Sequence, residues 1–286
     1  MKIIIYFIEY IVVKILFFIF ILIGYKNSSN LGFLIGKYFG PLFRSKSLIK
    51  NNLIQANISD KNNFDLIATN VLGNYGRIFS EYVFLKDFRN EKLANYISIN
   101  GQKYLDDIIK KQKKVVFISG HFNNFELMAM QLEKYGVNLT AIYRPLNNIF
   151  LNKTMEKIRT HFICKKQIKK GRSGSRELVK NFKEGSSIAL MIDQRVREGI
   201  SVPFFQKSCS TTTIPAQLVK KYECEIVPIY IERKKNHFFE MTVSQPLVFN
   251  KSLSIDDISV ELNKILEKMI LKNLDQWIWT HNRWQK

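Results

Sequence analysis

The chain has 286 residues, and its 44 Lys and Arg against 24 Asp and Glu give a formal charge of +20. With 46% hydrophobic and 13% aromatic residues it is not a disordered basic tail, because so apolar a chain must bury a core. The charge indicates an anionic partner, which is nucleic acid, an acidic protein or anionic lipid. Because 33 of the 44 bases are Lys, lysine-rich coding bias is an alternative source of part of the excess.

The N-terminal segment predicts a membrane anchor. In residues 3–25, all but Glu9, Lys14 and Gly24 are apolar or Tyr, which approaches the ~20 residues that a helix needs to cross a bilayer. Glu9 and Lys14 lie about 140° apart around a helix and define no polar face, so a short tilted span is favoured over a helix lying in the membrane plane. We expect an anchor over residues 1–26 and a single domain over residues 27–286.

Basic residues follow the apolar run and predict its orientation. No Asp or Glu occurs between residues 10 and 59, and five bases lie beyond the run in that interval: Lys26, Lys37, Arg44, Lys46 and Lys50. The positive-inside rule then keeps the domain on the cytoplasmic side, where these bases also meet anionic lipid headgroups.

The body of the chain alternates helical and strand patterns. Helical spacing of apolar residues marks segments 64–78 and 104–111, and a capping box at Ser254 and Asp257 opens a last helix. Between them, short apolar runs predict strands that alternate with predicted helices at residues 125–135, 148–161, 175–183 and 214–222. The predicted strands are residues 115–119, 139–143, 187–192, 226–231 and 238–243.

This alternation indicates an α/β fold with a mostly parallel central sheet flanked by helices. Pro228 lies inside one of the predicted strands, and because proline donates no ladder hydrogen bond it argues for an edge position or a bulge.

The turn after the strand at residues 115–119 carries the strongest chemical signal. In such sheets ligands bind beyond the carboxyl ends of the strands, and this turn reads Ser-Gly-His-Phe-Asn-Asn-Phe-Glu over residues 119–126. If His121 lies in the loop and Glu126 in the first turn of the next helix, the carboxylate can fold back onto the imidazole. Such a pair makes a general base. The alternative is a structural histidine beside a surface glutamate.

The motif Gly-His-Phe-x-Asn-x-Glu after a strand resembles the signature of the late acyltransferases of lipid A biosynthesis, within the glycerolipid acyltransferase superfamily. Further segments agree with that family in its order along nearly the whole chain: residues 143–148, Arg159, 193–194, 202–205, 213–216, 226–228 and 276–284.

The resemblance implies an inner-membrane enzyme that transfers a fatty acyl group from acyl carrier protein to a hydroxyl of a lipid A precursor, without cofactor or metal. Carried over by position, it makes His121 the general base and Glu126 its orienting partner, with Asn124 on the substrate side. Relatives that act on glycerol phosphates typically carry Asp in place of Glu126 and a Phe-Pro-Glu-Gly motif, which this chain lacks.

Arginines cluster around the predicted site. Six of the eleven fall within 54 residues: Arg144, Arg159, Arg172, Arg176, Arg195 and Arg197. Their guanidinium groups match phosphate oxygens bidentately. Arg159 fits the family pattern best and is expected to contact substrate phosphate or the polarised thioester, and Arg144 comes next. The basic loop that carries Arg172 and Arg176 is expected to bind phosphate or the acidic carrier. The alternative for each is a solvated surface arginine.

Other candidate residues have two interpretations each. Asp193 and Gln194 follow a predicted strand and are expected to contact the acceptor, or else to cap a helix. Trp277, Trp279 and Trp284 fit either an interfacial belt or packing against the sheet. Cys164, Cys209 and Cys224 form neither an even disulfide framework nor a close-spaced metal pair.

Two alternatives to the lipid A function stay open at this stage. The same fold also serves an acyltransferase for another glycolipid or phospholipid, with acyl-CoA or acyl carrier protein as donor. The more remote alternative is a membrane-tethered nucleic-acid-binding protein. Because no basic stripe interleaves with aromatics and the arginines surround a candidate base, no nucleic-acid partner is expected.

Overall fold

The computed structural model describes residues 2–235 and 237–284, except for the side chain of Arg172. Within these residues, seven strands form the main sheet in the order β1-β9-β8-β2-β5-β3-β4, and β6 and β7 form a separate hairpin. The strand bounds are β1 (Ile97–Asn100), β2 (Val116–Ser119), β3 (Leu139–Tyr143), β4 (Lys166–Lys169), β5 (Ser187–Met191), β6 (Ile200–Phe204), β7 (Lys207–Thr211), β8 (Ile226–Arg233) and β9 (Phe239–Val243).

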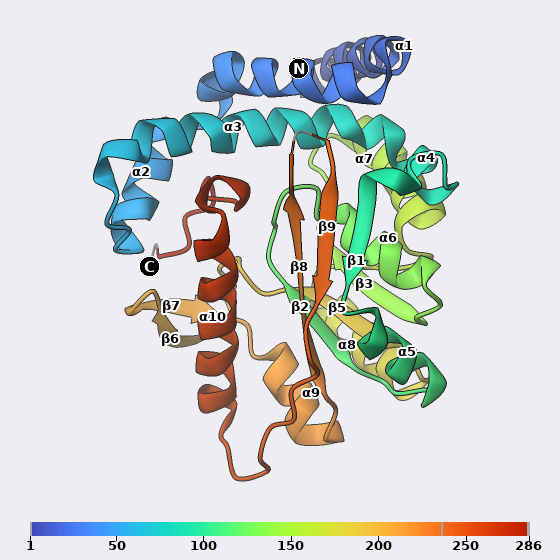
Figure 1. The fold of residues 1–286 in the computed structure, drawn as a ribbon, viewed down its shortest axis with the longest axis vertical. Helices are drawn as coiled ribbons and strands as arrows, with labels where there is room; N and C mark the ends of the chain where they lie inside the picture. Colours follow the sequence, from blue (N-terminus) through green and yellow to red (C-terminus); the bar gives the residue numbers. More distant parts are fainter. Residues whose placement is uncertain (1, 236, 285–286) are drawn as a thin grey trace.

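Helices cover both faces of the sheet and one of its ends (Figure 1). Their bounds are α1 (Lys2–Phe43), α2 (Lys46–Gln55), α3 (Phe64–Glu81), α4 (Leu85–Arg89), α5 (Gln102–Lys110), α6 (Glu126–Lys134), α7 (Ile149–Ile158), α8 (Arg172–Lys183), α9 (Ile214–Tyr222) and α10 (Ile255–Lys272). A π-helical turn, Arg159–Ile163, continues α7, and a short 3₁₀ turn, Leu274–Gln276, follows α10.

The predicted α/β fold with a mostly parallel sheet is confirmed. All neighbouring strand pairs of the main sheet are parallel except β8 and β9. The interior strands β2, β5 and β8 bury most of their residues on both faces, which explains why they are continuous apolar runs in the sequence.

The strands that the sequence analysis missed lie at the margins. β1 and β4 are the two edges of the main sheet, and their residues are exposed or half-exposed apart from the buried Ile168, so neither is an apolar run. The β6–β7 hairpin lies apart from that sheet, against α10. An edge strand needs only one buried face, which weakens the hydrophobic pattern that identifies it.

Pro228 does not mark an edge strand, which was one of the two expectations, because β8 is an interior strand of the sheet. Pro228 pairs with Ile118 of β2 at the end of that ladder, and pairing with β9 begins at the next residue, Ile229. The proline therefore occupies the one point of β8 where the hydrogen-bonded partner changes.

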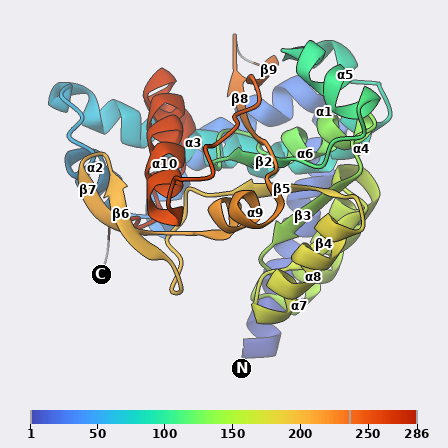
Figure 2. The ribbon, with the colours of Figure 1, turned by 90° about the horizontal axis from the view of Figure 1, so that it is seen from below.

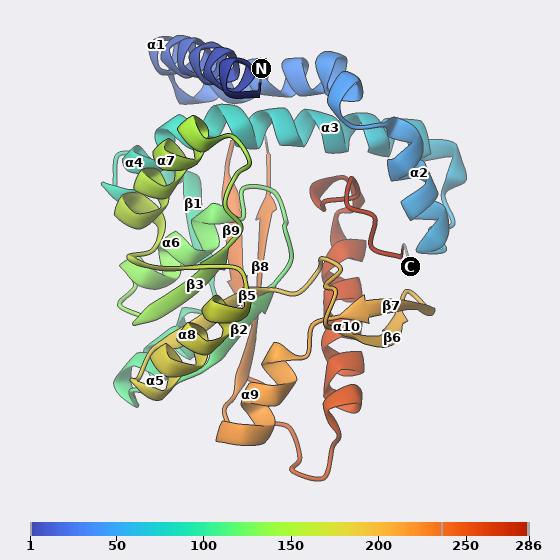
Figure 3. The same cartoon turned by 180° about the vertical axis from the view of Figure 1, so that it is seen from behind.

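Two helices, α3 and α1, close the end of the sheet to which the parallel strands point (Figure 1). The strands β8, β2, β5, β3 and β4 run toward this end of the sheet, whereas β1 and β9 run away from it. α3 crosses this end, and α1 packs on the outside of α3 (Figure 3). Gly24, with φ of 75° and ψ of 167°, breaks α1 into an N-terminal arm (residues 2–23) and a second arm (residues 25–43). Glycine permits this kink because it has no Cβ.

The N-terminal arm contacts the body near both of its ends. Phe17 and Phe20 pack on Phe79 of α3. Near the N-terminus, Asn148 donates hydrogen bonds to the Tyr6 carbonyl at 2.8 Å and to the Glu9 carboxylate at 2.9 Å. The arm runs alongside α7 (Figure 2).

Candidate active site

Strand register brings His121 and Asp193 together. β2 and β5 are parallel neighbours in which Ser119 pairs with Met191, so the residues two positions past each strand end meet at the same edge of the sheet. The Nδ1 atom of His121 lies 2.8 Å from Oδ1 of Asp193. The sequence analysis expected Asp193 to contact substrate; the structure instead makes it the hydrogen-bond partner of the candidate base.

The Asp193 carboxylate is fully buried and has several donors. Its Oδ2 accepts the backbone N–H of His121 at 2.6 Å and the indole N–H of Trp277 at 2.9 Å. Burial raises the pKa of Asp193, but the neighbouring imidazolium and these hydrogen bonds bring it below its usual value. Asp193 is therefore a carboxylate at neutral pH, and it can orient the His121 ring and stabilise its protonated form.

The same pair sets the basicity of His121. Burial lowers the pKa of His121, but the Asp193 charge and hydrogen bond more than offset it, so this pKa lies above the ordinary histidine value. With Nδ1 directed at Asp193, Nε2 is the remaining basic atom, and it makes no hydrogen bond to the described residues. The side chain of His121 is 20% exposed, which leaves it accessible to a substrate.

Glu126 does not form the predicted hydrogen bond with His121. It is the first residue of α6, and its Oε1 accepts hydrogen bonds from Arg159 Nε at 2.9 Å, Arg159 Nη2 at 2.7 Å and the Tyr82 hydroxyl at 3.0 Å. Its charge acts on His121 only through space and helps to raise the histidine pKa. The reason is local: the turn ends in a helix whose start directs Glu126 toward the π-helical turn that carries Arg159.

The guanidinium group of Arg159 is held by contacts with other side chains of the protein. Its side chain is 15% exposed and is ion-paired with Glu126. Its guanidinium also lies over the ring of Tyr143, 5.6 Å from the centroid. Burial lowers the pKa of Arg159, but Glu126 raises it more, so the guanidinium stays charged.

A buried ion pair lies beneath the catalytic turn, which is the segment between β2 and α6 (residues 120–125) that carries His121. Arg233 of β8 and Glu81 of α3 approach to 2.8 Å, and both side chains are almost fully buried. Arg233 Nε donates to Asn123 Oδ1 at 3.1 Å, and Asn124 Nδ2 donates to Glu81 at 3.1 Å. Asn124 is fully buried, so its predicted contact with substrate is replaced by this structural one.

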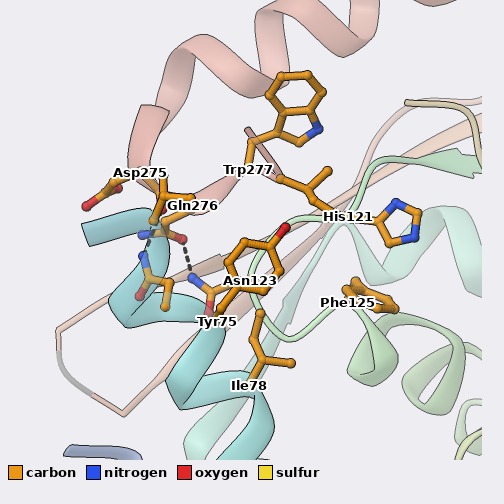
Figure 4. Close-up of a pocket in the computed structure, with 11 residues that line it drawn as sticks. Tyr75, Ile78, His121, Asn123, Phe125, Asp275, Gln276 and Trp277 are labelled. Carbon is orange, nitrogen blue, oxygen red and sulfur yellow. Dashed lines mark hydrogen bonds between the residues drawn. The ribbon is translucent and has the colours of Figure 1, made fainter. Parts of the chain in front are cut away.

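A small pocket adjoins His121 (Figure 4). Its free volume is about 20 Å³, and its walls come from α3, the catalytic turn and the segment after α10. Tyr75 and Ile78 line one side, Trp277 lies opposite, and Phe125 meets the His121 ring edge-on at a centroid distance of 4.7 Å. The pocket holds about one water molecule, so a substrate requires its walls to part.

The remaining predicted arginines lie at the same edge of the sheet but farther along it. β3 and β4 are parallel neighbours, with Tyr143 opposite Lys169, so Arg144 and the segment that leads to Arg176 both follow carboxyl strand ends. Arg144 and Arg176 are exposed, and neither forms an ion pair with a described residue. Gln194 is half-buried beside Asp193, and the side chain of Arg172 is outside the described residues.

The tryptophans near the C-terminus pack inside rather than forming an interfacial belt. Trp277 and Trp279 are 2% and 0% exposed, and Trp284 stacks on Phe204 at a centroid distance of 5.6 Å. Sequence reasoning overlooked the active-site contact of Trp277, because an indole far along the chain gives no local sign of which carboxylate it meets. Among residues 2–235 and 237–284, no cluster of three or more His, Cys, Asp or Glu side chains is placed to hold a metal ion.

An Asp–His pair at adjacent strand ends beside a pocket is typical of enzymes that use general-base catalysis, among them transferases and hydrolases. Comparison with known proteins gives the family. The model of the bacterial lipid A biosynthesis acyltransferases matches residues 1–286, and the chain belongs to this family. It is therefore an acyltransferase of lipid A biosynthesis type.

Individual relatives are distant. The chain is 22% identical to a lipid A biosynthesis acyltransferase of Haemophilus influenzae over 88% of this chain and 83% of that protein. It is also 22% identical to the lipid A biosynthesis lauroyltransferase of Escherichia coli over 68% of this chain and 64% of that protein. The crystal structure of the 1-acyl-sn-glycerophosphate acyltransferase PlsC from Thermotoga maritima aligns with 98% of this chain at 12% identity and a TM-score of 0.42.

Proposed function

We propose that this enzyme transfers a fatty acyl group from the thioester of acyl carrier protein to a hydroxyl of a lipid A precursor. The observation that carries the chemistry is the His121–Asp193 pair, which leaves a basic Nε2 beside a pocket. The lipid A acceptor is supported by the family to which the chain belongs. The acidic carrier is supported by the net charge of +20 and by the exposed Arg144 and Arg176.

In the proposed reaction, Nε2 of His121 takes the proton of the acceptor hydroxyl while that oxygen attacks the thioester carbonyl. Asp193 stabilises the imidazolium that forms. The tetrahedral intermediate collapses with cleavage of the carbon–sulfur bond, and the leaving thiolate takes the proton back from His121. An ester and a free carrier thiol result, with no covalent enzyme intermediate.

Phosphates on the acceptor need a cationic subsite away from the base. β5 and β3 lie between β2 and β4, so Arg144 and the segment that leads to Arg176 are two to three strands from His121. At about 4.8 Å per strand this is roughly 10–14 Å, which suits a phosphate borne by a sugar whose hydroxyl is at the base. Arg144 and Arg176 are the proposed phosphate contacts, with Gln194 closer to the base, whereas Arg159 acts through its ion pair with Glu126.

The membrane supplies the acceptor, and α1 is the proposed contact. α1 is the helix of the described chain that is long and apolar enough to cross a membrane, by length and composition. Its N-terminal arm contacts the body near Tyr6 and again at Phe20, which are about 21 Å apart on a helix. A helix held against the domain over that length cannot cross the bilayer unless the domain follows it. We therefore favour the arm lying in the surface of the inner membrane, on the cytoplasmic side, over the tilted span.

Exposed apolar side chains support this orientation. The exposed side chains of the N-terminal arm are apolar except for Lys2, Glu9 and Lys14, and the second arm adds Tyr38, Leu42 and Phe43, which are 65–79% exposed. Glu9, the acid that interrupts the apolar run, is paired with Asn148 rather than directed at lipid. Both arms of α1 therefore offer an apolar surface to one leaflet.

The test is transfer by the purified full-length protein, with acyl carrier protein thioester or acyl-CoA as donor and either a lipid A precursor or a lysophospholipid as acceptor. We expect product from the carrier thioester and the lipid A precursor, and an undetectable rate for His121→Ala in a protein with unchanged circular dichroism. Full activity of His121→Ala would overturn the mechanism. A preference for the lysophospholipid would overturn the proposed acceptor, and a preference for acyl-CoA would overturn the proposed donor.

A further inference from the structure

The C-terminal strap, residues 274–284, contacts the candidate active site through Trp277 and lines the pocket beside His121. It follows α10 and returns across α2, α3 and the β6–β7 hairpin to the end of the described chain (Figure 1). Trp277 in this strap donates its indole N–H to Oδ2 of Asp193 at 2.9 Å. It is separated from Asp193 by 84 positions in the sequence.

The strap is fixed by hydrogen bonds on both sides of Trp277. Asn74 of α3 donates to the Asp275 carbonyl at 2.8 Å, and Asn52 of α2 donates to the Trp279 carbonyl at 2.7 Å. The backbone N–H of Asn123 in the catalytic turn donates to the Gln276 carbonyl at 2.9 Å. Trp277 is thus held within a rigid segment, and its ring is 2% exposed.

A second contact ties the strap to the segment that carries Asp193. The backbone N–H of Arg195 donates to Nε2 of His281 at 3.0 Å. Burial lowers the pKa of His281, which keeps this imidazole neutral and able to accept that bond. The strap therefore holds the residues after β5 at two points, the Asp193 side chain and the Arg195 backbone.

We propose that Trp277 is a positioning residue for the reaction, whose indole N–H fixes Oδ2 of Asp193 so that Oδ1 meets Nδ1 of His121. This rests on the proposed function, because it acts through the base. The two carboxylate oxygens have different partners, so the loss of the indole N–H leaves the backbone N–H of His121 as the remaining donor to Oδ2. With one donor fewer on Oδ2, more of the negative charge of the carboxylate acts on His121, and its orientation is held less tightly.

The test is Trp277→Phe, read through the pH dependence of kcat/KM. The base must be neutral to act, so activity rises with pH through the pKa of His121. Without the indole donor, Asp193 attracts the imidazolium more strongly, which raises the pKa of His121. We therefore expect the acidic limb of the pH profile, where kcat/KM rises with pH, to move to higher pH by about 0.5 unit, and kcat to fall about tenfold. A purely structural tryptophan lowers activity equally at all pH values.

The chain offers a matched control in Trp279→Phe. Trp279 is as deeply buried in the same strap and stacks edge-on against Trp277 at 4.6 Å, but its indole N–H donates to the Leu274 carbonyl. We expect that variant to lose stability without moving the acidic limb. The other ionisable groups that act on the pair are unchanged in both variants: Glu126 and Arg159 on one side, Tyr75 of α3, and His281 and Arg283 of the strap.

Should Trp277→Phe fail to fold, benzothienylalanine at position 277 removes only the N–H and keeps the ring shape. An acidic limb at the same pH in either folded variant, or an equal shift in Trp279→Phe, overturns the proposal. A wild-type enzyme without any acidic limb would instead contradict the base mechanism, so the two failures are distinguishable.

Discussion

At the scale of the residue, the hydrogen-bond partner of His121 differs from the one that the local motif predicts. His121 and Glu126 are five positions apart, yet the hydrogen bond of His121 goes to Asp193, 72 positions away. Glu126 is ion-paired with Arg159 instead. Two carboxylates near one imidazole thus have separate tasks: Asp193 orients it by contact, and Glu126 acts on it through space while holding Arg159.

Substitution of Asp193 by Asn tests this division of tasks. The carboxylate raises the pKa of His121, so its removal should move the acidic limb of kcat/KM to lower pH. Loss of the orienting charge should also lower kcat about 100-fold or more. The pH profile of the purified variant measures both.

Asp106→Asn is the control for that experiment, because Asp106 accepts a hydrogen bond from Tyr135 at the surface and has no contact with His121. Its profile should match that of the unaltered enzyme. If the acidic limb of the kcat/KM profile of Asp193→Asn stays at the same pH or moves to higher pH, Asp193 does not set the basicity of His121.

At the scale of the element, the contact between α1 and α3 depends on glycines. A Cβ on Gly76 of α3 would lie 1.9 Å from the Gly32 carbonyl oxygen, and one on Gly36 of α1 would lie 2.2 Å from the Leu72 carbonyl oxygen. Backbone atoms cannot yield as a side chain does. The two helices approach so closely because side chains are absent at these crossing points.

Gly76→Ala should therefore destabilise the protein by about 2–3 kcal/mol, because α1 must move outward from α3. Thermal unfolding of the detergent-solubilised protein measures the change. Gly40→Ala is the graded control, since its Cβ would meet only the Leu72 side chain at 3.1 Å. Equal unfolding temperatures for the two variants would show that the glycine contact does not fix α1.

At the scale of the whole molecule, the site and the membrane surface are joined through α3. One side of α3 lines the pocket beside His121, and its other side carries α1. Ser29 of α1 donates to Glu81, which also holds Arg233 and Asn124 beneath the catalytic turn. The helix that we propose to lie on the membrane is thus connected by buried hydrogen bonds to the turn that carries His121.

The proposed orientation of α1 predicts where the N-terminus lies. An epitope tag placed before residue 1 should be cleaved by protease in inverted inner-membrane vesicles and protected in right-side-out vesicles, as is the domain itself. If the arm spans the bilayer, the tag becomes accessible from the opposite side to the domain. A tag at the C-terminus reports the side of the domain in the same preparations.

The sequence by itself determined the features that depend on neighbours along the chain. Apolar runs predicted the interior strands, and the capping box at Ser254 and Asp257 predicted the start of α10. The turn at residues 119–126 identified His121 and, with the other segments, the family. Each of these signals comes from residues within a few positions of one another.

Only the tertiary structure decided which distant residues meet. Strand periodicity does not state lateral order, so the sequence did not show that β5 lies beside β2 and places Asp193 against His121. Nor did it show that Trp277 reaches the same carboxylate, or that α7 and α3 hold the N-terminal arm. These contacts depend on sheet order and on the packing of helices over the strand ends, which local hydrophobic patterns leave open.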